Sequence, residues 1–135
     1  METWPTGRLL STASRLVEHA WIERLAELGL THAGLVVLHL LSGGPVSQVD
    51  LAGAARVQVQ TMSRTVGRLE REEFVSRVRD PGDARRLLVS RTDSGSEIWQ
   101  RARLLESEVF PREVDGAELR SALLQIIRTR SDRWA

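Results

Sequence analysis

Three pairs of apolar residues, each spaced five positions apart around a polar residue, fall within residues 30–62. The pairs are Leu30 and Leu35 around Thr31, Val46 and Leu51 around Ser47, and Val57 and Met62 around Gln58. In this arrangement, the hydrophobic staple, the residue before the N-cap packs against the fourth residue of the helix. Thr and Ser are good caps, whereas Gln is a poor one. The sequence therefore predicts three helix starts in close succession.

Apolar residues at steps of three and four continue each start, which is the pattern of a helix with a buried face. An earlier helix of this kind runs from about Leu9 to Leu28 and ends at Gly29. The helix that begins after Thr31 is apolar nearly all round, so we expect it to be buried on most sides. The Ser-Gly-Gly-Pro segment at residues 42–45 stops it.

The next two predicted helices are short and closely joined. The first covers residues 47–54, and the second runs over residues 58–72. Met62, Val66 and Leu69 lie on one side of the second helix, and its other side is polar and basic. Two short helices joined by a tight turn, the second with a basic outer face, form the helix-turn-helix layout.

A predicted β-hairpin follows, because β-forming residues at 74–78 and 85–90 flank the turn-forming segment Arg-Asp-Pro-Gly-Asp-Ala at 79–84. A helix-turn-helix followed by such a hairpin is a winged helix. Two more helices are predicted over residues 92–110 and 113–130. The predicted fold class is mostly α with a small β-hairpin, a winged helix-turn-helix domain flanked by N-terminal and C-terminal helices.

Positive charge gathers in the middle of the chain, although the whole chain carries only +1. Residues 1–55 sum to −2, residues 56–91 to +4 and residues 92–135 to −1, because the central block has nine arginines against five acids. Every cation is an arginine, whose planar guanidinium can bind phosphate or a guanine edge through two hydrogen bonds. This distribution favours an anionic partner at the centre of the chain.

Several classes of protein are excluded by composition. The chain has no cysteine, which removes disulfides, thiolate chemistry and Cys-ligated zinc. His19, His32 and His39 are not spaced as metal ligands, so we expect no metal and no other cofactor. The apolar segment 33–41 is far shorter than the ~20 residues of a membrane span, and the first ten residues do not form a secretory signal. We expect a cytoplasmic protein with no membrane partner.

Several segments in this order carry a family resemblance. They are Leu30-Thr31, residues 44–52 (Gly-Pro-Val-Ser-Gln-Val-Asp-Leu-Ala), 61–70 (Thr-Met-Ser-Arg-Thr-Val-Gly-Arg-Leu-Glu), 80–85 (Asp-Pro-Gly-Asp-Ala-Arg) and 89–92 (Val-Ser-Arg-Thr). Between Leu30 and Gly95, about half of the chain, the sequence resembles the MarR family of bacterial transcription regulators. The Asp-x-Arg motif of the hairpin, directly after the helix-turn-helix, is the most specific part of this resemblance.

The resemblance implies a homodimer that binds double-stranded DNA at a pseudo-palindromic operator. It also implies repression of transcription, and release of the DNA by a small effector in some members. It assigns residues 1–30 and 93–135 to dimerisation helices and residues 31–92 to the DNA-binding domain. The second short helix would enter the major groove and Arg85 the minor groove. Asp83 would orient a nearby arginine.

The N-terminal residues of a recognition helix reach base edges. Gln can pair with adenine, and the methyl groups of Val59 and Thr61 can meet a thymine methyl. The full set of candidate DNA-contacting residues is Ser47, Gln58, Val59, Gln60, Thr61, Ser63, Arg64, Arg68, Arg79, Asp83, Arg85 and Arg86.

The chain departs from the family pattern at two places. Arg56 and Gln58 stand where the family more often has a turn glycine and a capping serine, which predicts a strained or differently capped turn. Ala84 replaces a frequent basic residue at the wing tip, where Arg86 could compensate.

An effector pocket, for a small aromatic or anionic molecule, would involve Trp21, His39 and Trp99. The two tryptophans fit core or dimer packing better.

Other interpretations of the basic region remain open. The arginines of residues 58–71 could form a solvated surface paired with Glu70, Glu72 and Glu73. A winged helix could also bind an acidic protein surface without preferring a DNA sequence. An enzyme is disfavoured, because the sequence has no nucleophile–base pairing and no glycine-rich phosphate loop.

Overall fold

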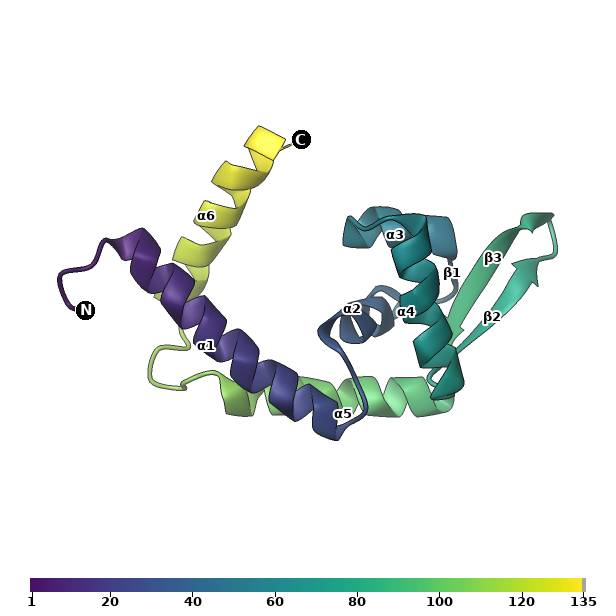
Figure 1. The fold of residues 1–135 in the computed structure, drawn as a ribbon, viewed down its shortest axis with the longest axis horizontal. Coiled ribbons are helices and arrows are strands. Elements are labelled where there is room, and N and C mark those ends of the chain that lie inside the picture. Colours follow the sequence, from purple (N-terminus) through teal and green to yellow (C-terminus); the bar gives the residue numbers. More distant parts are fainter. Residues whose placement is uncertain (135) are drawn as a thin grey trace.

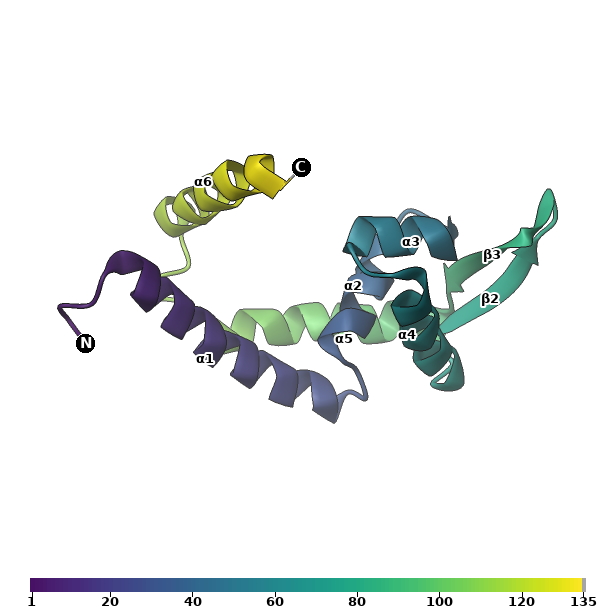
Figure 2. The same ribbon diagram turned by 45° about the horizontal axis from the view of Figure 1, so that its top comes forward.

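The computed structural model describes the backbone of residues 1–134 and the side chains of residues 1–131. Its elements, in chain order, are α1 (Thr6–Glu27), α2 (His32–Leu40), β1 (Val46–Ser47), α3 (Gln48–Ala55), α4 (Val59–Arg71), β2 (Val75–Asp80), β3 (Asp83–Arg91), α5 (Asp93–Val109) and α6 (Ala117–Trp134). Helices α2–α4 and the β2–β3 hairpin gather at one end of the molecule, whereas α6 and the N-terminal half of α1 form the other end (Figures 1 and 2). The fold class predicted from the sequence is confirmed.

Two of the three predicted helix starts are capped as expected. The hydroxyl of Thr31 accepts a hydrogen bond from the Gly34 N–H at 3.0 Å, and the hydroxyl of Ser47 accepts one from the Asp50 N–H at 3.1 Å. Each cap satisfies a backbone donor that the first turn of a helix leaves without a partner. Thr92 caps α5 in the same way.

The sheet is larger than the predicted hairpin. Its strand order is β1-β3-β2, all antiparallel, and Val46 pairs with Val89. Strand β1 was not predicted, because two residues are too short to show an alternating pattern. The hairpin strands are also longer than expected and leave only Pro81 and Gly82 as the turn, with a register irregularity at Arg79 and Asp80. The last helix begins at Ala117 rather than residue 113.

One hydrophobic core joins the helices of the winged helix to α1 and α5. Leu25 of α1, Leu38 of α2, Leu51 of α3, Val66 of α4 and Val89 of β3 are all fully buried in it. Helix α5 adds Ile98 and Ala102. Because the core draws on α1 and α5, it crosses both predicted domain boundaries, which remain a prediction.

The junction between α4 and the wing packs closely against the start of α5. Glu73 adopts a left-handed backbone with φ 64°, and its carbonyl accepts a hydrogen bond from the Thr92 hydroxyl at 2.7 Å. A Cβ built at Gly95 would overlap the carbonyl oxygen of Phe74. Only glycine fits at this point, so the start of α5 packs directly against the segment that joins α4 to β2.

Apolar side chains at the other end of the molecule are not covered. Leu16 of α1, Leu104 of α5 and Ile127 of α6 are 68%, 70% and 58% exposed. Helix α6 stands apart from the winged helix in both views (Figures 1 and 2). Across residues 1–134, no helix is both long enough and apolar enough to cross a membrane.

Candidate nucleic-acid interface

Helix α4 is divided cleanly into a buried and an exposed side. Met62, Val66 and Leu69 recur at steps of three and four, and all three are buried against the core. Gln60, Arg64 and Arg68 are exposed, and Ser63 and Thr65 are half-buried at the border between the two sides. The 3.6-residue helical period explains this division, and it leaves the polar side of α4 free to contact a partner.

The turn that leads into α4 has the strain expected from its sequence. Arg56 lies in the left-handed region, with φ 57° and ψ 44°, where glycine is normally favoured. Gln58 occupies the N-cap position but makes no side-chain capping hydrogen bond. Both departures from the family pattern therefore have the predicted local effect, although the turn itself is kept.

The arginines of α4 are not occupied by neighbouring acids. Among residues 1–131, neither Arg64 nor Arg68 has an ion pair, and Glu70 pairs with Arg77 of β2 instead. The i,i+4 pairs that a solvated helix surface would use are thus missing from this part of the chain. Arg68 also lines a surface hollow between α4 and the α1–α2 loop.

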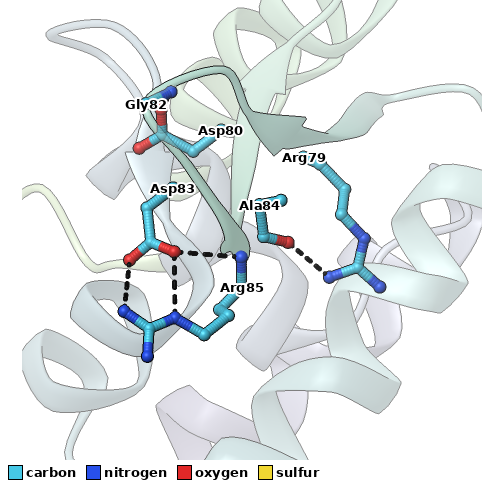
Figure 3. A network of polar contacts seen from close by, with 6 residues as sticks. All are labelled: Arg79, Asp80, Gly82, Asp83, Ala84 and Arg85. Atoms are coloured by element: carbon cyan, nitrogen blue, oxygen red, sulfur yellow. Dashed lines mark hydrogen bonds and ion pairs between the residues drawn. The ribbon is translucent and has the colours of Figure 1, made fainter.

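The wing tip is held by two aspartates (Figure 3). Asp80 accepts a hydrogen bond from the Gly82 N–H at 2.8 Å and fixes the turn. Asp83 accepts hydrogen bonds from both the backbone N–H and the Nε of Arg85, each at 3.1 Å. The hydrogen bond from the Arg85 side chain, followed by the backbone bond, lowers the pKa of Asp83 below its ordinary value of 3.8. Asp83 orients an arginine as predicted, and that arginine is Arg85.

The side chain of Arg85 points away from the body of the protein. Its side chain is 91% exposed, and its only ion pair is with Asp83 within the tip. Arg79 turns across the hairpin and donates to the carbonyl oxygen of Ala84 at 2.8 Å (Figure 3). The Nη2 of Arg86 lies 3.5 Å from the Oδ2 of Asp50 on α3. This ion pair links the wing to α3, the first helix of the helix-turn-helix, which we call the support helix.

Two of the predicted contact residues face the protein. Ser47 is 3% exposed and its hydroxyl caps α3, so it is not available to DNA, and its inclusion was wrong. Ser63 is half-buried and its hydroxyl accepts a hydrogen bond from Arg77 at 3.4 Å. Arg77 itself is half-buried, because the strand alternation places it on the same face as the buried Val75.

The three effector candidates differ in their exposure: Trp21 is buried, Trp99 is half-buried and His39 is exposed. Trp21 is buried in the core, as its helical position suggested. His39 and Trp99 lie with ring centroids 6.0 Å apart. The guanidinium groups of Arg91 and Arg103 lie 4.6 and 4.9 Å from the Trp99 ring. Within residues 1–131, whose side chains the structure describes, no three His, Asp or Glu side chains gather as a metal site would require.

The fold and the basic end define a winged helix-turn-helix protein. Residues 30–87 match the sequence profile of the MarR family. Residues 30–87 therefore form a MarR-family domain. The chain is 32% identical over 96 residues to the HTH-type transcriptional regulator YdcH of Bacillus subtilis (strain 168). This match covers 67% of this chain and 65% of YdcH. The chain is 33% identical over 97 residues to the HTH-type transcriptional repressor NicR of Pseudomonas putida (strain KT2440), with coverage of 71% and 61%. These matches span less than two thirds of either relative.

The likeness to a solved structure extends over nearly the whole chain. The transcriptional repressor CouR, bound to a 23-mer DNA duplex, is 27% identical and superposes with a TM-score of 0.80. The match covers 94% of this chain and 92% of that one. The outer helices, which carried no motif in the sequence, are therefore arranged as in CouR.

Proposed function

We propose that this chain is a transcriptional regulator that binds double-stranded DNA in a sequence-specific manner as a homodimer. The observation that carries the proposal is the placement of Arg64, Arg68 and Arg85 at one end of the fold, exposed and without an ion pair to the rest of the body. A surface of exposed arginines on a helix and an adjacent wing fits the charge and shape of a duplex. The names of YdcH, NicR and CouR support the same function.

In this proposal α4 is the recognition helix and lies in the major groove. Gln60 near its N-terminus is suited to an adenine, and Val59 to a thymine methyl. Arg64, one turn further on, suits a guanine edge or a phosphate. Arg85 at the narrow wing tip suits the adjacent minor groove, where the negative potential is strongest when the groove is narrow.

The homodimer is supported by the apolar surface of the α1, α5 and α6 end. Leu16 of α1, Leu104 of α5 and Ile127 of α6 are large and exposed, and none of them lies on α2, α3, α4 or the sheet. Large exposed apolar side chains suit an interaction site, and a twofold partner would present the same surface in return. The resulting pair would carry two wings and two recognition helices toward one duplex, in the cytoplasm where a bacterial operator lies.

Repression is the mode that the comparisons favour, since NicR and CouR are both named as repressors. Relief by a small anionic or aromatic molecule belongs to the same proposal. The stacked Trp99, Arg91 and Arg103 next to His39 offer a ring and positive charge to such a molecule, whereas the buried Trp21 does not.

The test is selection of bound duplexes from a random pool by the purified protein. We expect two inverted half-sites whose centres lie about one helical turn apart, roughly 10 base pairs. Enrichment of a single unrepeated half-site would contradict the dimer, and failure to enrich any sequence would contradict specific DNA binding. The variant Arg64→Gln should relax the preference at one base position in each half-site.

A further inference from the structure

We propose that Arg77 is a positioning residue that fixes the wing at a set angle to the recognition helix, so that both reach their grooves together. The proposal rests on the proposed DNA-binding function. Arg77 was not among the residues that the sequence selected as contacts. Its position on β2, rather than at the wing tip, gives it a different role from Arg85.

The side chain of Arg77 points into the molecule. It is 21% exposed, against 91% for Arg85. Successive residues of a strand face opposite sides, so Arg77 shares its side with Val75, which is buried in the core. An arginine in this place is poorly placed to contact a phosphate directly.

One guanidinium joins three elements of the winged helix. The Nη1 of Arg77 donates to the Gln48 Oε1 at 3.0 Å and to the Ser63 Oγ at 3.4 Å. Its Nη2 donates to the Glu70 Oε1 at 3.4 Å. Gln48 begins α3 and is only 7% exposed, so its amide oxygen depends on this donor. The wing strand, the support helix and the recognition helix therefore meet at one side chain.

The side chain of Arg77 also passes close to the backbone of the recognition helix. Gly67 lies on α4 between Ser63 and Glu70, and a Cβ at Gly67 would lie 3.8 Å from the Nη2 of Arg77, which is ordinary van der Waals contact. Arg77 therefore lies directly against α4.

The fork shape of arginine suits this position. A guanidinium presents five N–H donors in a fixed plane, whereas a lysine ammonium is a single point charge. Lysine at residue 77 would keep the charge but could not reach three acceptors on two helices at once. The link therefore depends on the geometry of the side chain and not only on its charge.

A fixed wing angle has a consequence for binding. Once α4 lies in the major groove, Arg85 contributes fully to the binding free energy only if the wing tip already lies over the adjacent minor groove. If the wing is mobile, ordering it on binding costs entropy and reduces that contribution. Without the Arg77 link, we expect the contribution of Arg85 to fall while the fold persists. The contributions of Arg77 and Arg85 should therefore be coupled.

The first test needs no DNA. Because the chain has no cysteine, spin labels at Gln60→Cys and Gly82→Cys report the distance from the recognition helix to the wing tip in protein diluted with unlabelled chain. We expect both Arg77→Gln and Arg77→Lys to widen the distance distribution at least twofold. The control Arg71→Gln removes a charge from an exposed position on α4 and should leave the width unchanged. An unchanged width in both Arg77 variants overturns the proposal.

The second test measures coupling on a selected duplex. We expect Arg85→Ala to weaken binding about tenfold in the wild-type background, but threefold or less in the Arg77→Gln background. Equal losses in the two backgrounds overturn the proposal. Failure of the wild type to bind any selected duplex refutes the proposed function instead, and the spin-label result then decides the role of Arg77 alone. If Arg77→Gln does not fold, Gln48→Met, which removes one acceptor and keeps the side-chain shape, takes its place with the same two criteria.

Discussion

The two ends of the molecule bury their apolar residues to very different degrees. In the winged helix, Leu38, Leu51 and Val66 have almost no contact with solvent. In the end formed by α1 and α6, Leu16 and Ile127 remain more than half exposed. A single chain therefore completes the core of the winged-helix end but leaves apolar side chains at the other end exposed. The difference separates what one copy can fold from what we propose two copies must assemble.

The largest expected effect is on the winged-helix end. Gly95→Ala places a methyl group against the backbone carbonyl of Phe74, and rigid backbone cannot yield as a flexible side chain would. We expect a loss of about 3 kcal/mol or more in the free energy of unfolding, measured by urea denaturation.

Gly53→Ala is the matched control, because a Cβ at Gly53 meets no atom within 4 Å. This helical position should gain about 0.5–1 kcal/mol. If Gly95→Ala were as stable as Gly53→Ala, the close packing of α5 on the α4–β2 junction would be wrong.

The next effect sharpens the contrast at the other end. Ile127→Glu places a charge on the exposed apolar face of α6, which each proposed copy would bury. Burial of an isoleucine side chain contributes about 1.5–3 kcal/mol to the free energy of association, and the residue occurs twice in a symmetric pair. We therefore expect the dissociation constant of the dimer, measured by sedimentation equilibrium, to rise about a hundredfold or more. The monomer should keep its helical circular dichroism. Gln125→Glu, on the same helix, serves as the control and should leave the association unchanged.

A smaller effect concerns the wing alone. Arg85→Ala should weaken binding to the selected duplex about tenfold. It removes a tip arginine that is 91% exposed and whose ion pair, with Asp83, leaves it at the surface of the wing. Unfolding and dimer association should stay as in the wild type, since Arg85 makes no contact with the core. Equal affinity of the variant and the wild type would remove the wing from the interface.

The smallest effect is on the titration of Asp83. The hydrogen bonds from Arg85 lower the pKa of Asp83 from 3.8. The Asp83–Arg85 contact is therefore fully formed at pH values above 3.8 and is lost as the pH falls through the lowered pKa of Asp83. Carboxyl NMR should place the midpoint below 3.8, and Arg85→Ala should return it toward that value. Arg86→Ala should move it less, since Arg86 acts only through charge at longer range. If the titration midpoint of Asp83 were the same in the wild type and in Arg85→Ala, the contact between the two side chains would be wrong.

Local signals in the sequence were sufficient for most of the winged helix. Thr31 and Ser47 cap their helices through side-chain chemistry that depends only on neighbouring residues. The left-handed backbone of Arg56 also followed from a local departure in the turn. These features need no knowledge of distant contacts, and for that reason a single sequence predicts them.

Features that depend on distant contacts were missed or wrongly assigned. Strand β1 exists because Val46 pairs with Val89, more than forty positions away. The role of Arg77 depends on Gln48, twenty-nine residues earlier, although its alternation with Val75 was a usable signal. Ser47 was assigned both to a helix cap and to DNA, and only its burial in the folded chain shows that its hydroxyl faces the protein. The effector residues were chosen by type, and Trp21 is separated from the other two by burial.

The central claim is that the exposed arginines of α4 and the wing bind a DNA duplex. Titration of a selected duplex across salt concentrations tests it most directly, because each phosphate neutralised adds about 0.9 to the slope of log affinity against log salt. For a dimer that makes six or more phosphate contacts, we expect affinity to fall about a thousandfold between about 50 and about 200 mM salt. A folded dimer whose binding is absent, or does not change with salt, would contradict the account.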